Sequence, residues 1–299
     1  MLLGIPAPIF GADDRREIIF VVVVSGTATP YLLTSADGIR WVKRLHAGNN
    51  PYYLCYGKGK FVGAAPGIVN ASQRIAWSND GFKWQAPANN LIDASSITFA
   101  NDLFFVTVRS GPPAGLYSSS DAVTWNTLTI PIYPDAVCYG TLWVAASGDG
   151  SMATSTNATT WTKRTSSFGT TAINALAYGG GVYVAAGDTG KIASSTNGTS
   201  WTQRTSGFGT SRIARLAYGA GIFVAVGSDG KVSTSPNGTA WTARGIIFEG
   251  NPINAIAFAK GLFVAVGSFG NIATSPDGIT WTQRVSGITA PINDITAKV

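Results

Sequence analysis

Short apolar runs alternate with small polar turns along the 299-residue chain, and this pattern returns about every 40 residues. One unit is clearest in the second half. It contains an apolar run at 173–179, a second run that begins with the aromatic residue Tyr183, a shorter run at 191–195, and a polar run after Trp201. Runs of this length, bounded by glycine, asparagine and aspartate, are typical of strands joined by hairpins. No helical hydrophobic period of useful length occurs.

Seven of the nine tryptophans keep the register of this repeat. Each closes the pattern Ser, any residue, Asp or Asn, Gly or Ala, two residues, Trp. Asp-Gly or Asn-Gly between two strand-like runs predicts a tight hairpin turn. The tryptophan then buries a large apolar surface under the turn and holds the hairpin to its neighbour. The seven structural tryptophans are Trp41, Trp84, Trp125, Trp161, Trp201, Trp241 and Trp281.

Four short antiparallel strands in each 40-residue unit are typical of a propeller blade. We therefore predict an all-β fold, a seven-bladed β-propeller of four-stranded antiparallel blades over residues 17–299, with residues 1–16 as an N-terminal arm or rim segment. The propeller begins with a second strand at 17–24, and the segment 292–299 matches the first strand of the other units. This match favours closure of the ring by the C-terminal strand pairing into the N-terminal blade. Residues 8–11 are the alternative for that position.

Composition agrees with strands and turns. Charged residues make up 12% of the chain, glycines number 36, and Glu17 and Glu249 are the two glutamates. The net charge of +6 and the pI near 9.4 would suit an anionic partner. However, no run of three basic residues occurs, which argues against nucleic acid. The apolar run 18–24 is too short to span a bilayer, and residues 1–10 carry no basic start of a signal peptide, so we expect no membrane insertion.

The residues that carry metal, cofactor or nucleophilic chemistry are sparse. Cys55 and Cys138 occupy equivalent positions in two repeats, and His46 is the one histidine, so we predict no metal site and no cofactor. The two cysteines lie where other repeats have alanine, which predicts small buried residues two blades apart. The segment 187–191 faintly resembles a phosphate loop, but sister repeats contain the same pattern, which favours a hairpin tip.

Candidate contact residues come from two places in the repeat. Arginines recur three residues after a motif tryptophan, and they predict either a cationic ring for an anionic partner or exposed charges that prevent edge-to-edge pairing; the second interpretation is favoured. Phe168 and Phe208 lie in connections between blades, with Arg212 nearby. They predict either an exposed protein or glycan contact or rings that fill the space between blades. The arginines proposed as contacts are Arg164, Arg204, Arg244 and Arg284.

The Ser-x-Asp-Gly-x-x-Trp hairpins resemble those of the Asp-box or BNR-repeat propellers, over nearly the whole chain from Glu17 to Val299. That group includes sialidases, photosystem assembly propellers and repeat proteins of tailed bacteriophages. In the segment 275–281 glycine follows aspartate directly, so the box is one residue shorter than the usual one. The near-identical repeats, rich in threonine, serine and glycine, look most like phage virion propellers.

The resemblance implies a non-catalytic virion component, such as a tail-tip, fibre or decoration protein, that contacts another virion protein or a host-surface glycan. Its location would be the virion. An exported bacterial scaffold or assembly factor, at the cell exterior or in the periplasm, is the alternative. A sialidase-like glycosidase is less favoured, because it needs an arginine cluster, an acid/base and an activated tyrosine confined to single blades. The arginines and tyrosines here recur with the repeat, and we predict no catalytic residues.

Overall fold

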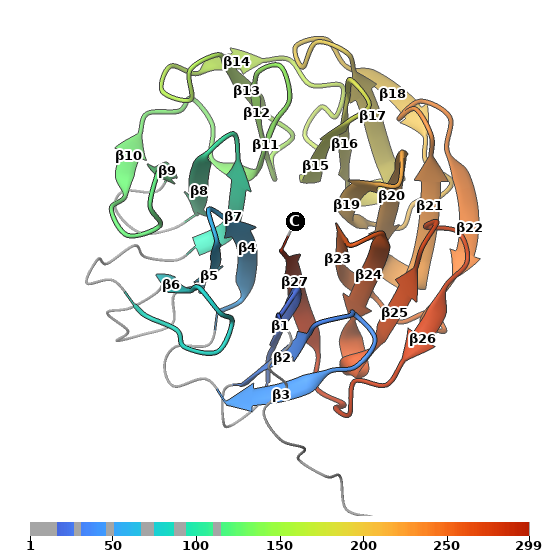
Figure 1. The fold of residues 1–299 in the computed structure, drawn as a ribbon. Coiled ribbons are helices and arrows are strands. Elements are labelled where there is room, and N and C mark those ends of the chain that lie inside the picture. Colours follow the sequence, from blue (N-terminus) through green and yellow to red (C-terminus); the bar gives the residue numbers. More distant parts are fainter. Residues whose placement is uncertain are drawn as a thin grey trace, which may run out of the picture.

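Antiparallel pairing of neighbouring strands builds a ring of seven sheets around a central channel (Figure 1). The computed structural model describes residues 17–26, 31–45, 51–66, 75–86, 94–109 and 115–298. Within these residues each sheet is one blade. In six blades the strands run in chain order from the channel to the perimeter, and in the N-terminal blade the last described strand, Ile292–Ala297, is innermost. The predicted all-β, seven-bladed propeller is therefore confirmed.

The strands are numbered along the chain. Blade 1 contains β27 (Ile292–Ala297), β1 (Phe20–Val24), β2 (Tyr31–Ser35) and β3 (Val42–Leu45). Blade 2 contains β4 (Tyr53–Gly57), β5 (Lys60–Ala64) and β6 (Ile75–Ser78). Blade 3 contains β7 (Ala94–Ala100), β8 (Leu103–Val108), β9 (Gly115–Ser119) and β10 (Asn126–Leu128). Blade 4 contains β11 (Pro134–Tyr139), β12 (Trp143–Ser147), β13 (Met152–Ser155) and β14 (Thr162–Arg164).

The second half of the ring is the most regular. Blade 5 contains β15 (Ile173–Gly179), β16 (Val182–Gly187), β17 (Lys191–Ser195) and β18 (Thr202–Thr205). Blade 6 contains β19 (Ile213–Gly219), β20 (Ile222–Gly227), β21 (Lys231–Ser235) and β22 (Thr242–Ile246). Blade 7 contains β23 (Ile253–Ala259), β24 (Leu262–Gly267), β25 (Ile272–Ser275) and β26 (Thr282–Arg284). One-turn 3₁₀ segments, η1 (Asp188–Gly190), η2 (Ser228–Gly230) and η3 (Ser268–Gly270), join the second and third strands of these blades.

Blade 2 departs from the four-stranded pattern. Its outermost pairing is reduced, within the described residues, to a single bridge between Trp77 and Gln85. The backbone amide of each residue donates to the carbonyl of the other over 2.8 Å. The turn and the motif tryptophan are therefore present in this blade, but the fourth strand does not extend along β6.

The C-terminal strand closes the ring, as predicted. β27 pairs antiparallel with β1, and Val22 lies opposite Ile295. The amide of Lys298 donates to the carbonyl of Ile19 over 2.7 Å, which extends the ladder by one bond. Ile292 is fully buried and Ile295 is 5% exposed. The predicted arm at residues 1–16, including the alternative strand at 8–11, lies outside the described residues.

The core is distributed between the blades. Seven apolar clusters each combine side chains of two adjacent blades, and each includes the motif tryptophan of the later blade. Trp241 of blade 6, for example, packs against a cluster that contains Val184 of blade 5 and Phe223 of blade 6. Because apolar surface is removed from water at every blade junction, the ring is held together by seven comparable interfaces.

The repeated hairpin is a network of short-range hydrogen bonds. In blade 5 the hydroxyl of Ser195 accepts bonds from the amides of Asn197 and Gly198 at 3.3 and 2.8 Å. The side-chain oxygen of Asn197 accepts from the next two amides after Gly198, each at 2.9 Å. Gly198 has a φ of +72°, and its carbonyl accepts from the Trp201 indole at 3.2 Å. The serine, the Asx residue and the tryptophan therefore recur because each holds one part of the turn.

Candidate functional site

A β-bulge at the start of the inner strands shapes the mouth of the channel. In six blades the second residue of the inner strand is inserted between two pairs of the ladder. Such a bulge bends the strand and re-aims a side chain, and bulges are frequent beside functional sites. The inserted residues are Ser95, Asp135, Asn174, Ala214, Asn254 and Asn293.

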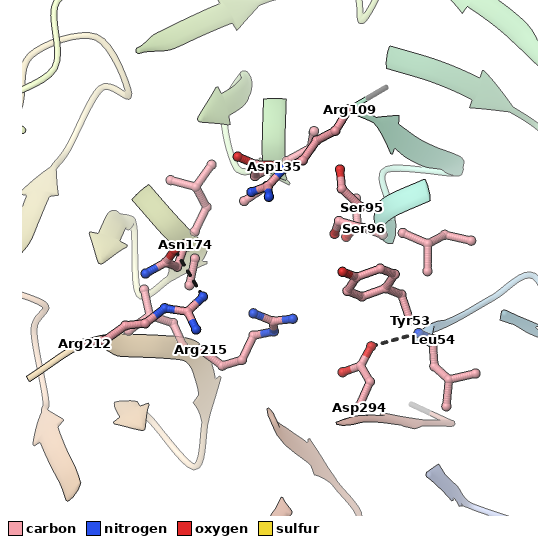
Figure 2. Close-up of a pocket in the computed structure, with 17 residues that line it drawn as sticks. Tyr53, Leu54, Ser95, Ser96, Arg109, Asp135, Asn174, Arg212, Arg215 and Asp294 are labelled. Atoms are coloured by element: carbon pink, nitrogen blue, oxygen red, sulfur yellow. Dashed lines mark hydrogen bonds and ion pairs between the residues drawn. The ribbon is translucent and has the colours of Figure 1, made fainter. Parts of the chain in front are cut away.

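A cavity of about 310 Å³ lies at this end of the channel, and its lining is mainly polar (Figure 2). Three arginines and two aspartates contribute to the lining, together with one tyrosine hydroxyl, two serines and an asparagine. The arginines outnumber the carboxylates by one. The labelled polar lining residues are Tyr53, Ser95, Ser96, Arg109, Asp135, Asn174, Arg212, Arg215 and Asp294.

Arg215 and Asp294 depart from the repeat at the same position. Both are the residue after the bulge, where blades 4, 5 and 7 have alanine. Alanine at this position needs no partner in the channel, whereas a guanidinium and a carboxylate are expensive to bury without one. Figure 2 shows the Arg215 side chain extending into the cavity, with Tyr53 and Asp294 on the facing wall. The two substitutions therefore give one region of a nearly symmetric ring its own chemistry.

Two of the three arginines are paired with carboxylates. The Arg109 guanidinium contacts Asp135, and the other oxygen of that carboxylate accepts from the amide of Gly148. The Nε of Arg212 lies 3.2 Å from Asp188 Oδ1. Arg212 is also 3.3 Å from the side-chain oxygen of Asn174. These contacts fix both guanidinium groups at the rim of the cavity.

Arg215 differs from the other two arginines. Its Nη1 donates to the carbonyl of Ala214 at 3.0 Å, and no ion pair joins it to a carboxylate of the described residues. Asp294 is instead held by backbone amides, since Leu54 donates to Oδ2 at 2.8 Å and Ile295 to Oδ1 at 3.0 Å. Burial raises the pKa of Asp294, while the positive charge of Arg215 acts in the opposite direction. Burial also raises the pKa of Tyr53.

The four repeat arginines predicted as contacts, Arg164, Arg204, Arg244 and Arg284, lie elsewhere, on the outer strands. In each case Nε donates to a hydroxyl of the neighbouring third strand, as in Arg204 to Ser194 at 2.9 Å and Arg244 to Thr234 at 2.8 Å. Arg164 and Arg284 make the same bond at 2.9 Å. The four side chains are thus spread around the perimeter, one per blade in blades 4 to 7, and none of them lines the central cavity.

Phe168 and Phe208 are buried at 0% and 1% exposure. They pack into the clusters between blades 4 and 5 and between blades 5 and 6, which is the space-filling alternative of the sequence analysis. Neither ring is available to a partner at the surface. Of the residues predicted to contact a partner, Arg212 alone lines the cavity.

Apart from Arg212, none of the polar residues that line the cavity was predicted from the sequence, including Tyr53, Arg215 and Asp294. A signal for the last two was present in the chain. When the inner strands are aligned on their isoleucine, the third residue is alanine in Ile173-Asn174-Ala175 but arginine and aspartate in the segments 213–215 and 292–294. The repeated fold needs only alanine at this position. A charged residue there therefore indicates a function other than holding the blade together.

The remaining reactive residues offer little chemistry. Burial raises the pKa of the Cys138 thiol to about 12 and raises that of Cys55 well above its ordinary value. Both are free and buried, so neither is present as a reactive thiolate at neutral pH. The described part of the chain holds no cluster of three or more potential metal-ligating side chains. It also holds no helix that is long and apolar enough to cross a membrane.

Comparisons with known proteins agree with the fold. Residues 136–245 match the family profile described as the DUF6242 beta propeller domain, which is less than half of the chain. The sequence matches no curated protein.

Among solved structures, YCF48 from Cyanidioschyzon merolae is 16% identical, with a TM-score of 0.60 over 93% of this chain and 97% of that chain. YCF48 bound to D1 peptide is 15% identical, with a TM-score of 0.59 over 92% of this chain and 86% of that chain. Virginiamycin B lyase from Staphylococcus aureus is 11% identical, with a TM-score of 0.68 over 90% and 89%. At these sequence identities the similarity defines the class of fold, a β-propeller. The function has to be inferred from the chemistry of the cavity.

Proposed function

We propose that the protein is a non-catalytic binding propeller whose central cavity holds an acidic group of a partner. The observation that carries this proposal is Arg215. It is a half-buried guanidinium that extends into the cavity without a carboxylate partner among the described residues, while Arg109 and Arg212 are paired beside it. A carboxylate from a ligand would complete the pairing and would gain strength from the low dielectric of the cavity.

Two kinds of partner fit this chemistry. The first is a neighbouring virion protein or an acidic host-surface glycan, as the phage-like repeats suggest. The second is a peptide segment of a protein that the propeller helps to assemble. The structure of YCF48 bound to D1 peptide supports the second option in so far as a propeller of this fold binds a peptide.

The site is tested with a defined set of acidic ligands. Sialylated and uronate-containing glycans and peptides with acidic C-termini are presented to the protein, and affinity is measured by interferometry. Arg215→Ala should weaken any bound ligand about tenfold or more, because a hydrogen bond to a charged group contributes about 1.5–3 kcal/mol. Arg204→Ala is the matched control, since it removes the same charge from an outer strand. Equal binding by wild type and Arg215→Ala would exclude the cavity as the site.

The biological setting needs a separate measurement. Mass spectrometry of purified particles from a phage that encodes the chain would detect it at a constant copy number if it is a virion component. Absence from the particles, with export by the host bacterium, would favour the scaffold alternative.

Catalysis is tested by incubation with fluorogenic sialosides and aryl glycosides. Turnover that a single substitution of Arg215, Asp294 or Tyr53 abolishes would overturn the non-catalytic proposal.

A further inference from the structure

The rim of the propeller, at the C-terminal ends of the outer strands, forms a surface that is separate from the central cavity. The last residue of each outer strand, or the residue directly after it, lies at the rim of the propeller. The residue type at this rim position differs between the two halves of the ring. Blades 3, 4 and 5 have threonine at this rim position, at 129, 165 and 205. Blades 6, 7 and 1 have Ile246, Val285 and Leu45, which are 57%, 87% and 73% exposed. Three adjacent blades, 6, 7 and 1, therefore form an apolar arc at the rim, whereas blades 3, 4 and 5 are polar at the same position.

An exposed aromatic lies in the same arc. Phe269 is the middle residue of η3, is 65% exposed, and has a φ of +59°. The equivalent residues of η1 and η2 are Thr189 and Asp229, with φ of +53° and +60°. A bulky side chain is disfavoured in this left-handed conformation, so the turn itself gives no reason for phenylalanine. An exposed phenylalanine in a strained backbone conformation indicates that Phe269 contacts a partner.

Two further changes in the repeat lie beside a groove between blades 7 and 1. In the junctions between blades 4 and 5 and between blades 5 and 6, a buried phenylalanine fills the connection and a lysine caps it. Lys191 Nζ donates to the carbonyl of Phe168 at 2.9 Å, and Lys231 Nζ donates to that of Phe208 at 3.2 Å. In the junction between blades 7 and 1, Ile288 replaces the phenylalanine, and Tyr31, which pairs with Leu45 as Lys191 pairs with Thr205, occupies the position of the lysine. An open groove of about 790 Å³, which we call the seam groove, lies beside the smaller Ile288.

The charges of the seam groove are of one sign. Lys43 and Arg284 line it, with Tyr31, Phe269, Val285 and Ile288, and none of its described lining residues is acidic. Lys43 Nζ lies 3.8 Å from the centre of the Tyr31 ring. Two copies of this surface would place basic groups against basic groups in a symmetric contact, which disfavours self-association. An acidic partner would meet complementary charge.

We propose that the seam groove binds an extended, acidic segment of a partner protein, whose aromatic or aliphatic side chains pack on Phe269 and Val285. Apolar anchors in a groove with a charged rim are typical of peptide recognition, since the anchors supply affinity and the charges supply orientation. The groove lies outside the central cavity, so this proposal stands independently of the acidic-group site at Arg215.

A displayed library of random 12-residue peptides, selected against the full chain, is the probe. We expect enriched peptides in which acidic residues flank an aromatic or aliphatic pair, and binding that weakens as salt is raised. The double variant Phe269→Asp/Val285→Asp should bind the selected peptides at least tenfold more weakly by fluorescence anisotropy. Because both side chains are exposed, its melting temperature should stay close to that of the wild type.

Matched variants make the outcome decisive. Thr205→Asp adds an acid at the same rim position of blade 5 and should leave binding unchanged, as should Arg204→Ala, which removes a positive charge from the outer strand of that blade. Three results would overturn the proposal: no enrichment above background, equal binding by the double variant, or loss of peptide binding in Arg215→Ala alone. Concentration-dependent self-association that the double variant abolishes would also overturn it, because the occupant would then be a second copy.

Discussion

At the scale of the residue, the glycines at the ends of several inner strands are required because an aromatic ring of the next blade packs directly against them. A Cβ on Gly179 would lie 2.1 Å from the ring of Tyr218, and one on Gly57 would lie 2.1 Å from the ring of Phe99. The Tyr218 ring packs in turn on Phe223, with ring centroids 4.7 Å apart. At the end of several inner strands, a glycine of one blade thus packs against an aromatic ring of the next blade, and this contact joins consecutive blades.

Gly179→Ala should destabilise the protein by about 1–3 kcal/mol, because the added methyl group forces the Tyr218 ring out of place. The free energy of unfolding in denaturant measures this cost. In the double variant Gly179→Ala/Tyr218→Ala the clash is gone, so the glycine substitution should cost much less there than in the wild type. Additive effects of the two substitutions would show that the ring does not cause the loss.

The turn carboxylates give the ring an asymmetric response to acid. The amides of Thr124 and Val123 donate to Asp121 at 2.8 Å each and lower the pKa of that carboxyl from 3.8 to about 2. The pKa of Asp277 is lowered by the same kind of amide bonds. Blades 4, 5 and 6 have asparagine at this position, which does not titrate in this range.

A carboxyl whose folded pKa is lowered stabilises the fold fully above its unfolded pKa and loses this contribution as pH falls through the folded pKa. Stability of blade 3 should thus decrease between about pH 3.8 and pH 2. Hydrogen exchange, corrected for intrinsic rates, should show faster opening at Val123 and Thr124 over this range than at Thr199 and Ser200 of blade 5. Asp121→Asn should remove the difference; its persistence in that variant would assign the acid sensitivity to other groups.

At the scale of the element, the bulges of the inner strands join neighbouring blades. The side-chain amide of Asn174 donates to the carbonyl of Ile213 at 3.1 Å, and that of Asn254 donates to Ile292 at 2.8 Å. Each bond passes from the bulge of one blade to the first residue of the next inner strand. Asn293 has the same position in β27, but its buried amide nitrogen has no acceptor among the described residues.

Asn254→Ala should destabilise the protein by about 1–3 kcal/mol, because it leaves the carbonyl of Ile292 without its donor at the closing junction. Asn293→Ala is the matched variant and should cost less, since its amide makes no such bond. Thermal and chemical denaturation of both variants provide the measurement. A larger loss for Asn293→Ala than for Asn254→Ala would contradict the assigned role of the bulge asparagines.

The same bulges explain which features the sequence could predict. The blade boundaries follow from residues that repeat for a local reason, such as Ser195 and Trp201, whose partners lie within the same hairpin. The cavity is harder to predict. Arg215 and Asp294 stand out in the aligned repeats, but the bulge that decides where their side chains lie is a feature of strand pairing and not of residue type. Phe168 remained ambiguous, because a phenylalanine next to glycine in a connection fits both the surface and a blade junction.

At the scale of the whole molecule, β27 links the two ends of the propeller. Burial of Ile292 and Ile295 contributes about 3–6 kcal/mol, which is comparable to the total stability of a small domain at about 5–15 kcal/mol. Removal of β27 would also expose the edge of β1 and the facing surfaces of two blades, and open edges favour aggregation.

Deletion of residues 292–299 should therefore give insoluble protein or protein without a cooperative melting transition. Deletion of residues 1–11 is the control, and it should leave folding intact. A synthetic peptide of residues 290–299, added during refolding of the shortened chain, should restore solubility and the melting transition. A shortened chain that is soluble and melts cooperatively without the peptide would show that the ring is stable while open.

Pairing of β1 with β27 also sets the order of events during synthesis. The ribosome adds about 5–20 residues per second, so the 268 residues from Ser25 to Ile292 take roughly 13–54 s. Throughout that interval the inner edge of β1, one of the most apolar strands of the chain, has no partner. Blades 2 to 7 can form from contiguous sequence as they emerge, whereas blade 1 must wait for the end of the chain. A chaperone, or fast assembly of the middle blades, would keep that edge from pairing with other chains during this interval.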